Sequence, residues 1–144
     1  MTDGKSLFDT SAVLPFLVPH PLSNEAEAAM IETEPVFLSF SKIEVANALR
    51  TFTKARHLSS EMAGEILAEF ITLPDFEDEH LYLRDALQLG IKFDHGVYDC
   101  LFVAASIALN VPLITADKKL RNKFAGHVPG GVILLGSAET ADFT

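Results

Sequence analysis

The chain has 144 residues, 20 acidic and 11 basic side chains, and a formal net charge of −9. Hydrophobic residues make up 49% of it, which excludes a disordered chain, and this length favours one domain. It has neither an uninterrupted apolar stretch of about 18 residues nor a signal-peptide pattern, so we expect a cytoplasmic protein with no membrane segment. The acidic balance alone argues against a nucleic-acid partner, because phosphate-binding proteins are usually basic.

Short apolar runs alternate with helical patterns through the first half of the chain. The elements predicted there, in chain order, are a strand over residues 5–9, a helix over 11–18, a helix over 24–33, a strand over 36–38, and helices over 41–56 and 59–73. Ser11, Asn24 and Ser59 are suited to begin three of these helices, because their side chains accept hydrogen bonds from free backbone N–H groups.

The second half continues the alternation. The elements predicted there are a helix over residues 80–89 that stops at Gly90, a helix over 96–109, a strand over 111–115, a helix over 117–124 and a strand over 132–135. Residues 75–79 fit either a short strand or a loop. The pattern predicts an α/β fold with a mostly parallel central sheet and helices on both faces. We expect one domain over residues 1–144, with its core at about 5–136 and a short C-terminal tail.

Four carboxylates are expected at one edge of this sheet. Asp9 closes the first strand, Asp117 follows the next-to-last strand, and Glu44 and Asp99 lie in the first turns of helices. Ligands of open α/β sheets bind beyond the carboxyl ends of the strands, where helices start. Each acid alone has a simpler interpretation, such as a capping box of Ser41 with Glu44, or a helix N-cap at Asp117.

The simpler interpretations do not explain why four acids should lie together at one edge of the sheet. Clustered carboxylates repel one another unless a cation lies between them. Mg²⁺ and Mn²⁺ prefer such oxygen ligands, whereas zinc is disfavoured because no His or Cys has ligand spacing. The sequence therefore predicts a Mg²⁺ or Mn²⁺ site.

Four segments carry these acids in a particular order: Leu7-Phe8-Asp9-Thr10-Ser11, Ser41-Lys42-Ile43-Glu44-Val45-Ala46-Asn47, Val97-Tyr98-Asp99-Cys100, and Leu113-Ile114-Thr115-Ala116-Asp117-Lys118. In order and spacing they resemble the PIN domain family, and within it the VapC-type ribonuclease toxins of toxin–antitoxin pairs. The resemblance spans about residues 7–135. It departs from the family at Gly96, where Ser or Thr is frequent.

The resemblance implies a three-layer α/β/α sandwich and Mg²⁺- or Mn²⁺-dependent cleavage of RNA. It also implies that Asp9, Glu44, Asp99 and Asp117 are the metal ligands and catalytic acids, with the hydroxyl of Thr10 or Thr115 assisting. A cognate antitoxin and a homodimer are the implied protein partners, through the helices predicted at 41–56 and 59–73. One turn after Glu44, Asn47 is a further candidate to hydrogen-bond a ligand carboxylate.

Basic residues gather directly after Asp117, at Lys118, Lys119, Arg121 and Lys123. They form either a solvated helix face or a rim that contacts RNA phosphates. Eight acids lie between residues 61 and 85, away from the expected site, so the charge distribution permits RNA binding that the net charge argues against. His95, four residues before Asp99, is interpreted as structural or solvated.

Two other functions remain as alternatives. A haloacid dehalogenase-like phosphatase also places an Asp after its first strand, but needs a second acid two residues later, where this chain has Ser11. A PIN-like fold without catalysis would act as a binding scaffold, and the presence of all four acids argues against that. A metal-dependent RNA cleavage assay distinguishes the scaffold from the nuclease.

Overall fold

Five parallel strands form one sheet at the centre of the computed structural model, which describes residues 4–136. The expected C-terminal tail lies outside the described residues. The strands are β1 (Lys5–Phe8), β2 (Glu34–Leu38), β3 (Phe76–Glu77), β4 (Leu113–Thr115) and β5 (Val132–Leu134). They lie in the order β3-β2-β1-β4-β5, with Leu7 of β1 opposite Val36 of β2 and Leu113 of β4. The acid-rich residues 75–79 thus contribute a short edge strand.

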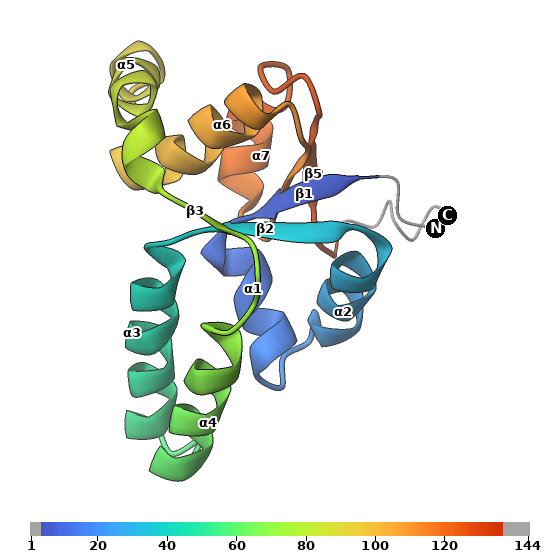
Figure 1. Cartoon of the computed structure of the whole chain (residues 1–144), viewed down its shortest axis with the longest axis vertical. Helices are drawn as coiled ribbons and strands as arrows, with labels where there is room; N and C mark the ends of the chain where they lie inside the picture. Colours follow the sequence, from blue (N-terminus) through green and yellow to red (C-terminus); the bar gives the residue numbers. More distant parts are fainter. Residues whose placement is uncertain (1–3, 137–144) are drawn as a thin grey trace.

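Helices cover both faces of the sheet. They are α1 (Thr10–Leu17), α2 (Ser23–Glu32), α3 (Ser41–Lys54), α4 (Ser60–Phe70), α5 (Leu83–Phe93), α6 (Val97–Leu109) and α7 (Lys118–Phe124), with a 3₁₀ turn η1 (Glu79–Tyr82) before α5. Figure 1 shows α1–α4 on one side of the sheet and α5–α7 on the other. The predicted three-layer sandwich is confirmed. No helix within residues 4–136 is long and apolar enough to cross a membrane.

Alternate strand residues build the two halves of the core. Leu7 and Leu113 pack with α5, α6 and α7, whereas Phe8 and Ile114, one residue further along, pack with α1–α4. Successive side chains of a strand point to opposite faces, so a short strand with two adjacent apolar residues serves both layers. Each such buried side chain contributes about 1.5–3 kcal/mol.

Helix α6 is the most buried of the helices. All residues from Cys100 to Ser106 are buried, as its apolar sequence predicts. Tyr98, by contrast, is 70% exposed, because the first turn of α6 emerges from the core at the edge of the sheet. The N-cap of α6 is Gly96, in extended backbone conformation and without a side-chain hydrogen bond.

The predicted cap at Ser11 is wrong, and the alternative interpretation of Glu44 as part of a capping box does not hold either. Helix α1 is capped by Asp9, whose carboxylate accepts a hydrogen bond from the Ala12 N–H, and not by Ser11. The capping box of Ser41 with Glu44 does not form, because both side chains turn instead toward Thr10 of α1. Tertiary contacts therefore replace local ones at both positions.

Two other helix ends also differ from the prediction. Helix α2 begins at Ser23, without a side-chain cap, rather than after Asn24. Helix α5 continues through Gly90 to Phe93 and ends where Asp94 adopts a left-handed conformation with φ of 51°. Gly90 instead allows the loop after α5 to pass close to the helix, because a Cβ at this position would lie only 2.9 Å from the carbonyl oxygen of His95.

The order of the strands defines where a ligand site can form. From β1 the chain moves to β2 and β3 on one side and later to β4 and β5 on the other. Open α/β sheets bind ligands beyond the strand ends at this point of reversal, which here lies between β1 and β4.

Candidate active site

A cleft of about 730 Å³ lies at this reversal point. Its polar lining includes all four predicted acids: Asp9, Glu44, Asp99 and Asp117. They come from four separate places, namely the end of β1, the first turns of α3 and α6, and the start of α7. Phe40, Phe102 and the exposed Tyr98 form an aromatic wall of the same cleft, where the Phe40 ring packs at a tilt of 40° against each of the other two rings.

Asp9 is the most buried of these acids, with 5% of its surface exposed. Its Oδ2 accepts a hydrogen bond from the Thr115 hydroxyl (2.5 Å), and its Oδ1 accepts bonds from the Ser11 hydroxyl (2.7 Å) and the Ala12 N–H (3.1 Å). The pKa of Asp9 is raised to about 6, chiefly by burial and to a smaller extent by the charge of Asp99, while these hydrogen bonds act in the opposite direction. The chain thus fixes both oxygens of this carboxylate at a desolvated position.

Glu44 is oriented by a second pair of hydroxyls. The Thr10 hydroxyl donates to Glu44 Oε1, and the Ser41 hydroxyl lies 3.0 Å from the Thr10 oxygen. Burial raises the pKa of Glu44, the bond from Thr10 lowers it, and the charge of Asp99 raises it. The Thr10 hydroxyl therefore orients Glu44, and its assisting role in catalysis stays a prediction.

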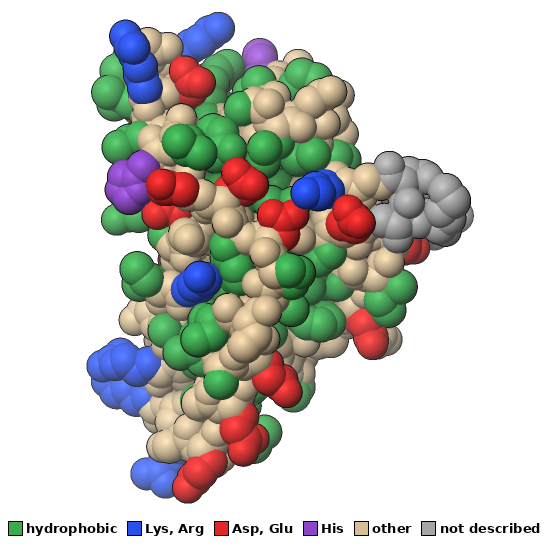
Figure 2. Space-filling view, in the orientation of Figure 1, with side chains coloured by type: hydrophobic (Ala, Val, Ile, Leu, Met, Phe, Trp, Pro, Cys, Tyr) green, Lys and Arg blue, Asp and Glu red, His purple; other side chains and the backbone are tan. Residues whose placement is uncertain are grey.

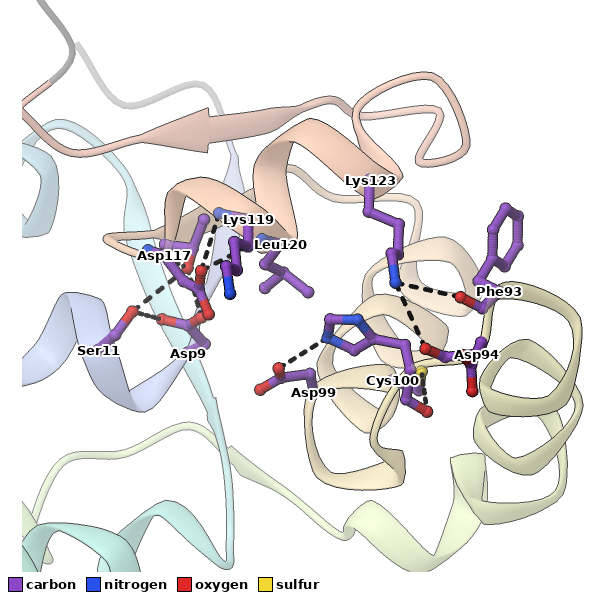
Figure 3. A network of polar contacts seen from close by, with 12 residues as sticks. Asp9, Ser11, Phe93, Asp94, Asp99, Cys100, Asp117, Lys119, Leu120 and Lys123 are labelled. Carbon is purple, nitrogen blue, oxygen red and sulfur yellow. Dashed lines mark hydrogen bonds and ion pairs between the residues drawn. The ribbon is translucent and has the colours of Figure 1, made fainter.

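Hydroxyls also join the ends of β1 and β4. Ser11 Oγ accepts the Ala116 N–H at 2.9 Å, and Thr115 Oγ1 accepts the Asp117 N–H at 3.0 Å. Since both hydroxyls also donate to Asp9, they connect that carboxylate to the backbone leading to Asp117 (Figure 3). Sequence reasoning missed this role of Ser11. The only signal was a hydroxyl two residues after the acid that closes the strand.

Asp117 caps α7, as the simpler interpretation predicts, and also lines the cleft. Its Oδ1 accepts the N–H groups of Lys119 (2.9 Å) and Leu120 (3.2 Å). No hydrogen bond to its Oδ2 occurs within residues 4–136. The cap and a ligand role are therefore compatible, because they use different oxygens.

Asp99 points from α6 toward Asp9 and Asp117 (Figure 3). Its Oδ2 lies 2.8 Å from Nε2 of His95. The Asp99 side chain is 44% exposed, the His95 side chain 15%. His95 thus contacts a site residue directly, whereas the sequence interpretation favoured a structural or solvated role.

The remaining candidates lie at different distances from the cleft. Asn47 lines it, but its amide makes no hydrogen bond to a carboxylate among the residues described. Four candidates lie on α7 outside the cleft lining: Lys118, Lys119, Arg121 and Lys123. The Lys123 ammonium contacts the carbonyl oxygens of Phe93 (3.1 Å) and Asp94 (3.4 Å).

The donor chemistry of the cleft fits a hard divalent cation. Its acids offer only oxygen atoms, and across residues 4–136 none of the four forms an ion pair with Lys or Arg. The four are not packed as tightly as the group Asp78, Glu79 and His80, whose ligand atoms all lie within 4.8 Å of one another. A looser set suits Mg²⁺ or Mn²⁺, which keep several water ligands.

Comparison with known proteins decides the family. A model of the PIN domain matches residues 6–124. The chain belongs to the PIN domain family. The curated protein Ribonuclease VapC3 of Pyrobaculum aerophilum is 31% identical to this PIN domain over 128 residues, which cover 86% of this chain and 98% of that protein.

Solved structures show the same fold. PAE2754 from Pyrobaculum aerophilum superposes with a TM-score of 0.68 at 16% identity, over 90% of this PIN domain and 83% of that chain. A toxin–antitoxin complex from Klebsiella pneumoniae gives 0.60 at 18% identity, covering 89% and 95%. VapBC2 from Rickettsia felis, bound to a DNA fragment from its promoter, gives 0.60 at 17%, covering 90% and 96%.

Proposed function

We propose that this PIN domain is an endoribonuclease that depends on Mg²⁺ or Mn²⁺ and acts as the toxin of a toxin–antitoxin pair. The observation that carries the proposal is the cleft at the reversal point of the sheet, where carboxylates from four elements meet without a Lys or Arg ion-pair partner among the described residues. The similarity of this PIN domain to a protein named as a ribonuclease supports the choice of RNA as substrate.

Asp9, Glu44, Asp99 and Asp117 are the residues that would hold the cation. When bound, a cation of this kind lowers the pKa of a coordinated water and offsets charge on the phosphate. Asp9 supplies a fixed, desolvated carboxylate, because Thr115, Ser11 and the Ala12 amide hold it. Glu44 and Asp99 are each held by one side chain, so either one can orient the attacking water or accept its proton.

A cleavage assay tests this function. Single-stranded RNA should be cut in the presence of Mg²⁺ or Mn²⁺ and left intact when EDTA removes the ion. RNA that stays whole under both conditions, with the protein folded, would favour the non-catalytic scaffold. Release of phosphate from a phosphomonoester, without RNA cleavage, would favour the phosphatase.

Lys118 and Lys119 are proposed to contact RNA phosphates beside the cleft. Both are exposed in the first turn of α7, directly after Asp117. In the view of Figure 2, basic side chains lie along the outer edge of α3, whereas acidic ones gather over α4 and across the middle of the molecule. Charge is thus unevenly distributed over this face, and the net value of −9 does not describe each part of it.

Replacing both lysines with alanine should weaken RNA binding roughly tenfold at low salt. Two lost phosphate contacts should also reduce the slope of log affinity against log salt by about 1.4 for single-stranded RNA. Fluorescence anisotropy over a salt series measures both quantities. All the proteins compared carry Asp9→Asn as well, so that the RNA is not cleaved. The matched control is Arg84→Ala with Lys92→Ala, which removes two charges from α5. Equal slopes for wild type and the α7 variant would contradict the proposed contacts.

An antitoxin is the proposed protein partner. Two structures with the same fold are described as a toxin–antitoxin complex and as VapBC2. A small protein encoded beside this one that binds it and stops RNA cleavage is the expected finding. RNA cleavage that such a protein leaves unaffected would argue for a nuclease outside toxin–antitoxin systems.

A second copy of the chain is the other proposed partner. Exposed apolar side chains lie on α5 at a spacing of four residues, at Leu83, Leu87 and Ile91. The sequence interpretation placed the protein-binding surface on α3 and α4, where Met62 and Ile43 are also exposed. Light scattering should give the mass of a dimer at micromolar concentration, and Leu87→Glu should reduce it to a monomer. A monomeric wild-type protein would rule the dimer out.

A further inference from the structure

We propose that His95 is a positioning residue for Asp99, and that Lys123 holds the loop that carries His95. The proposal rests on the proposed metal-dependent function and adds two residues to it. Neither belongs to the four acids, and Lys123 was expected from the sequence to contact RNA instead.

The bond between His95 and Asp99 has only one possible direction. An ionised carboxylate only accepts hydrogen bonds, so Nε2 of His95 carries the hydrogen and donates it to Asp99 Oδ2. The other oxygen of Asp99 has no hydrogen-bond partner within residues 4–136. The bond therefore selects one orientation of a side chain that is 44% exposed and leaves its Oδ1 available in the cleft.

His95 is itself held on several sides. Its ring packs edge-on against Phe124 of α7, with centroids 5.4 Å apart and an interplanar angle of 86°. Its backbone N–H donates to the carbonyl of Gly90 at 3.0 Å. The left-handed conformation of Asp94 turns the chain between α5 and α6 so that this contact forms. A side chain held in this way can impose its position on a freer one.

Lys123 fixes the same loop from α7. Its ammonium reaches across to the carbonyls of Phe93 and Asp94, the last residue of α5 and its C-cap (Figure 3). A cation at the C-terminal end of a helix also interacts favourably with the helix dipole. Lys123 and Phe124 of α7 thus position His95. Because Asp117 caps this helix and His95 bonds Asp99, α7 connects two of the four acids.

Residues that hydrogen-bond to a metal ligand, as His95 does to Asp99, orient the carboxylates and imidazoles that bind metals. Their loss typically lowers metal affinity or activity 10- to 100-fold. We therefore expect His95→Phe to weaken Mn²⁺ binding at least tenfold, because Phe keeps the ring packing but cannot donate. His95→Gln retains an N–H donor without the ring and should remain within about threefold of wild type. Lys123→Met should show an intermediate loss.

Isothermal titration of metal-free protein with Mn²⁺ at one fixed pH measures this directly, without relying on activity. Unfolding temperatures confirm that each variant is folded, and His57→Phe, at an exposed position, is the matched control. Steady-state kinetics on RNA should show a fall in kcat with little change in KM for His95→Phe.

The outcomes separate the two proposals. Wild-type protein that binds no Mn²⁺ and cuts no RNA would overturn the proposed function, and this inference with it. Wild-type binding together with unchanged affinity in His95→Phe would overturn the role of His95 alone. A loss in His95→Gln together with wild-type affinity in His95→Phe would show that ring packing, and not the hydrogen bond, is what matters. Wild-type affinity in Lys123→Met would show that Lys123 does not help to position His95.

Discussion

Asp9→Asn and Asp99→Asn proteins are expected to lose Mn²⁺-dependent RNA cleavage by roughly a thousandfold or more, equivalent to about 4 kcal/mol of transition-state stabilisation. Asn has nearly the same shape as Asp but carries no negative charge, so it holds a divalent cation poorly. Asp99 is half exposed and Asp9 keeps its acceptor oxygen for Ser11 and Ala12, so both variants should stay folded. Initial rates on single-stranded RNA measure the loss.

The control for this loss is Asp78→Asn. The exposed Asp78 belongs with Glu79 and His80 to a group at the start of η1 that lies outside the cleft lining. It should cleave RNA at the wild-type rate. Cleavage by Asp9→Asn at more than a tenth of that rate would show that the cleft is not the catalytic site.

Asp9→Asn should also make the metal-free protein more stable at pH 8, by about 3 kcal/mol. Burial raises the pKa of this carboxyl from 3.8 to about 6, which means that folding disfavours its charged form. Below about pH 3.8 the carboxyl is neutral in both the folded and the unfolded state, and the wild-type protein keeps its full stability. It loses this part of its stability as the pH rises through about 6, because the buried carboxyl must then ionise. Asn is neutral throughout, so the variant avoids this loss, and its unfolding temperature should be roughly 6–12 °C higher at pH 8.

Urea unfolding in EDTA at a series of pH values between 4 and 8 tests this prediction. The difference in unfolding free energy between variant and wild type should grow with pH and level off above about pH 7. Mn²⁺ should reverse the order, because it stabilises only a protein that binds it. Glu65→Gln, on the exposed side of α4, should stay within about 0.5 kcal/mol of wild type. A variant that is less stable than wild type in EDTA at pH 8 would contradict the desolvation of Asp9.

The layered fold was predictable from short apolar runs alternating with helical patterns, since few arrangements bury both faces of such strands. Helix ends were less predictable. Ser41 has the sequence of a cap, but a partner 31 residues away, Thr10, takes its hydroxyl. Gly90 looks like a helix stop, yet it allows the chain to return closely after α5 ends at Phe93. Local patterns cannot reveal such long-range contacts.

The four acids could be placed at one sheet edge because parallel strands end on the same side. Their environments could not be predicted in this way. The burial of Asp9 depends on hydroxyls from both Ser11 and Thr115, which are 104 residues apart in the chain. His95 appeared to be an ordinary loop histidine, because the spacing of four residues to Asp99 becomes a contact only where the loop meets α6.

Anomalous scattering from crystals grown with Mn²⁺ shows whether the four acids hold a divalent cation in the cleft. We expect a peak within ligand distance of Asp9 and Asp99, and no such peak in crystals of Asp9→Asn, as this assignment of the metal site requires. A peak only at Asp78, Glu79 and His80, or no peak in the cleft of a protein that cleaves RNA with Mn²⁺, would contradict it.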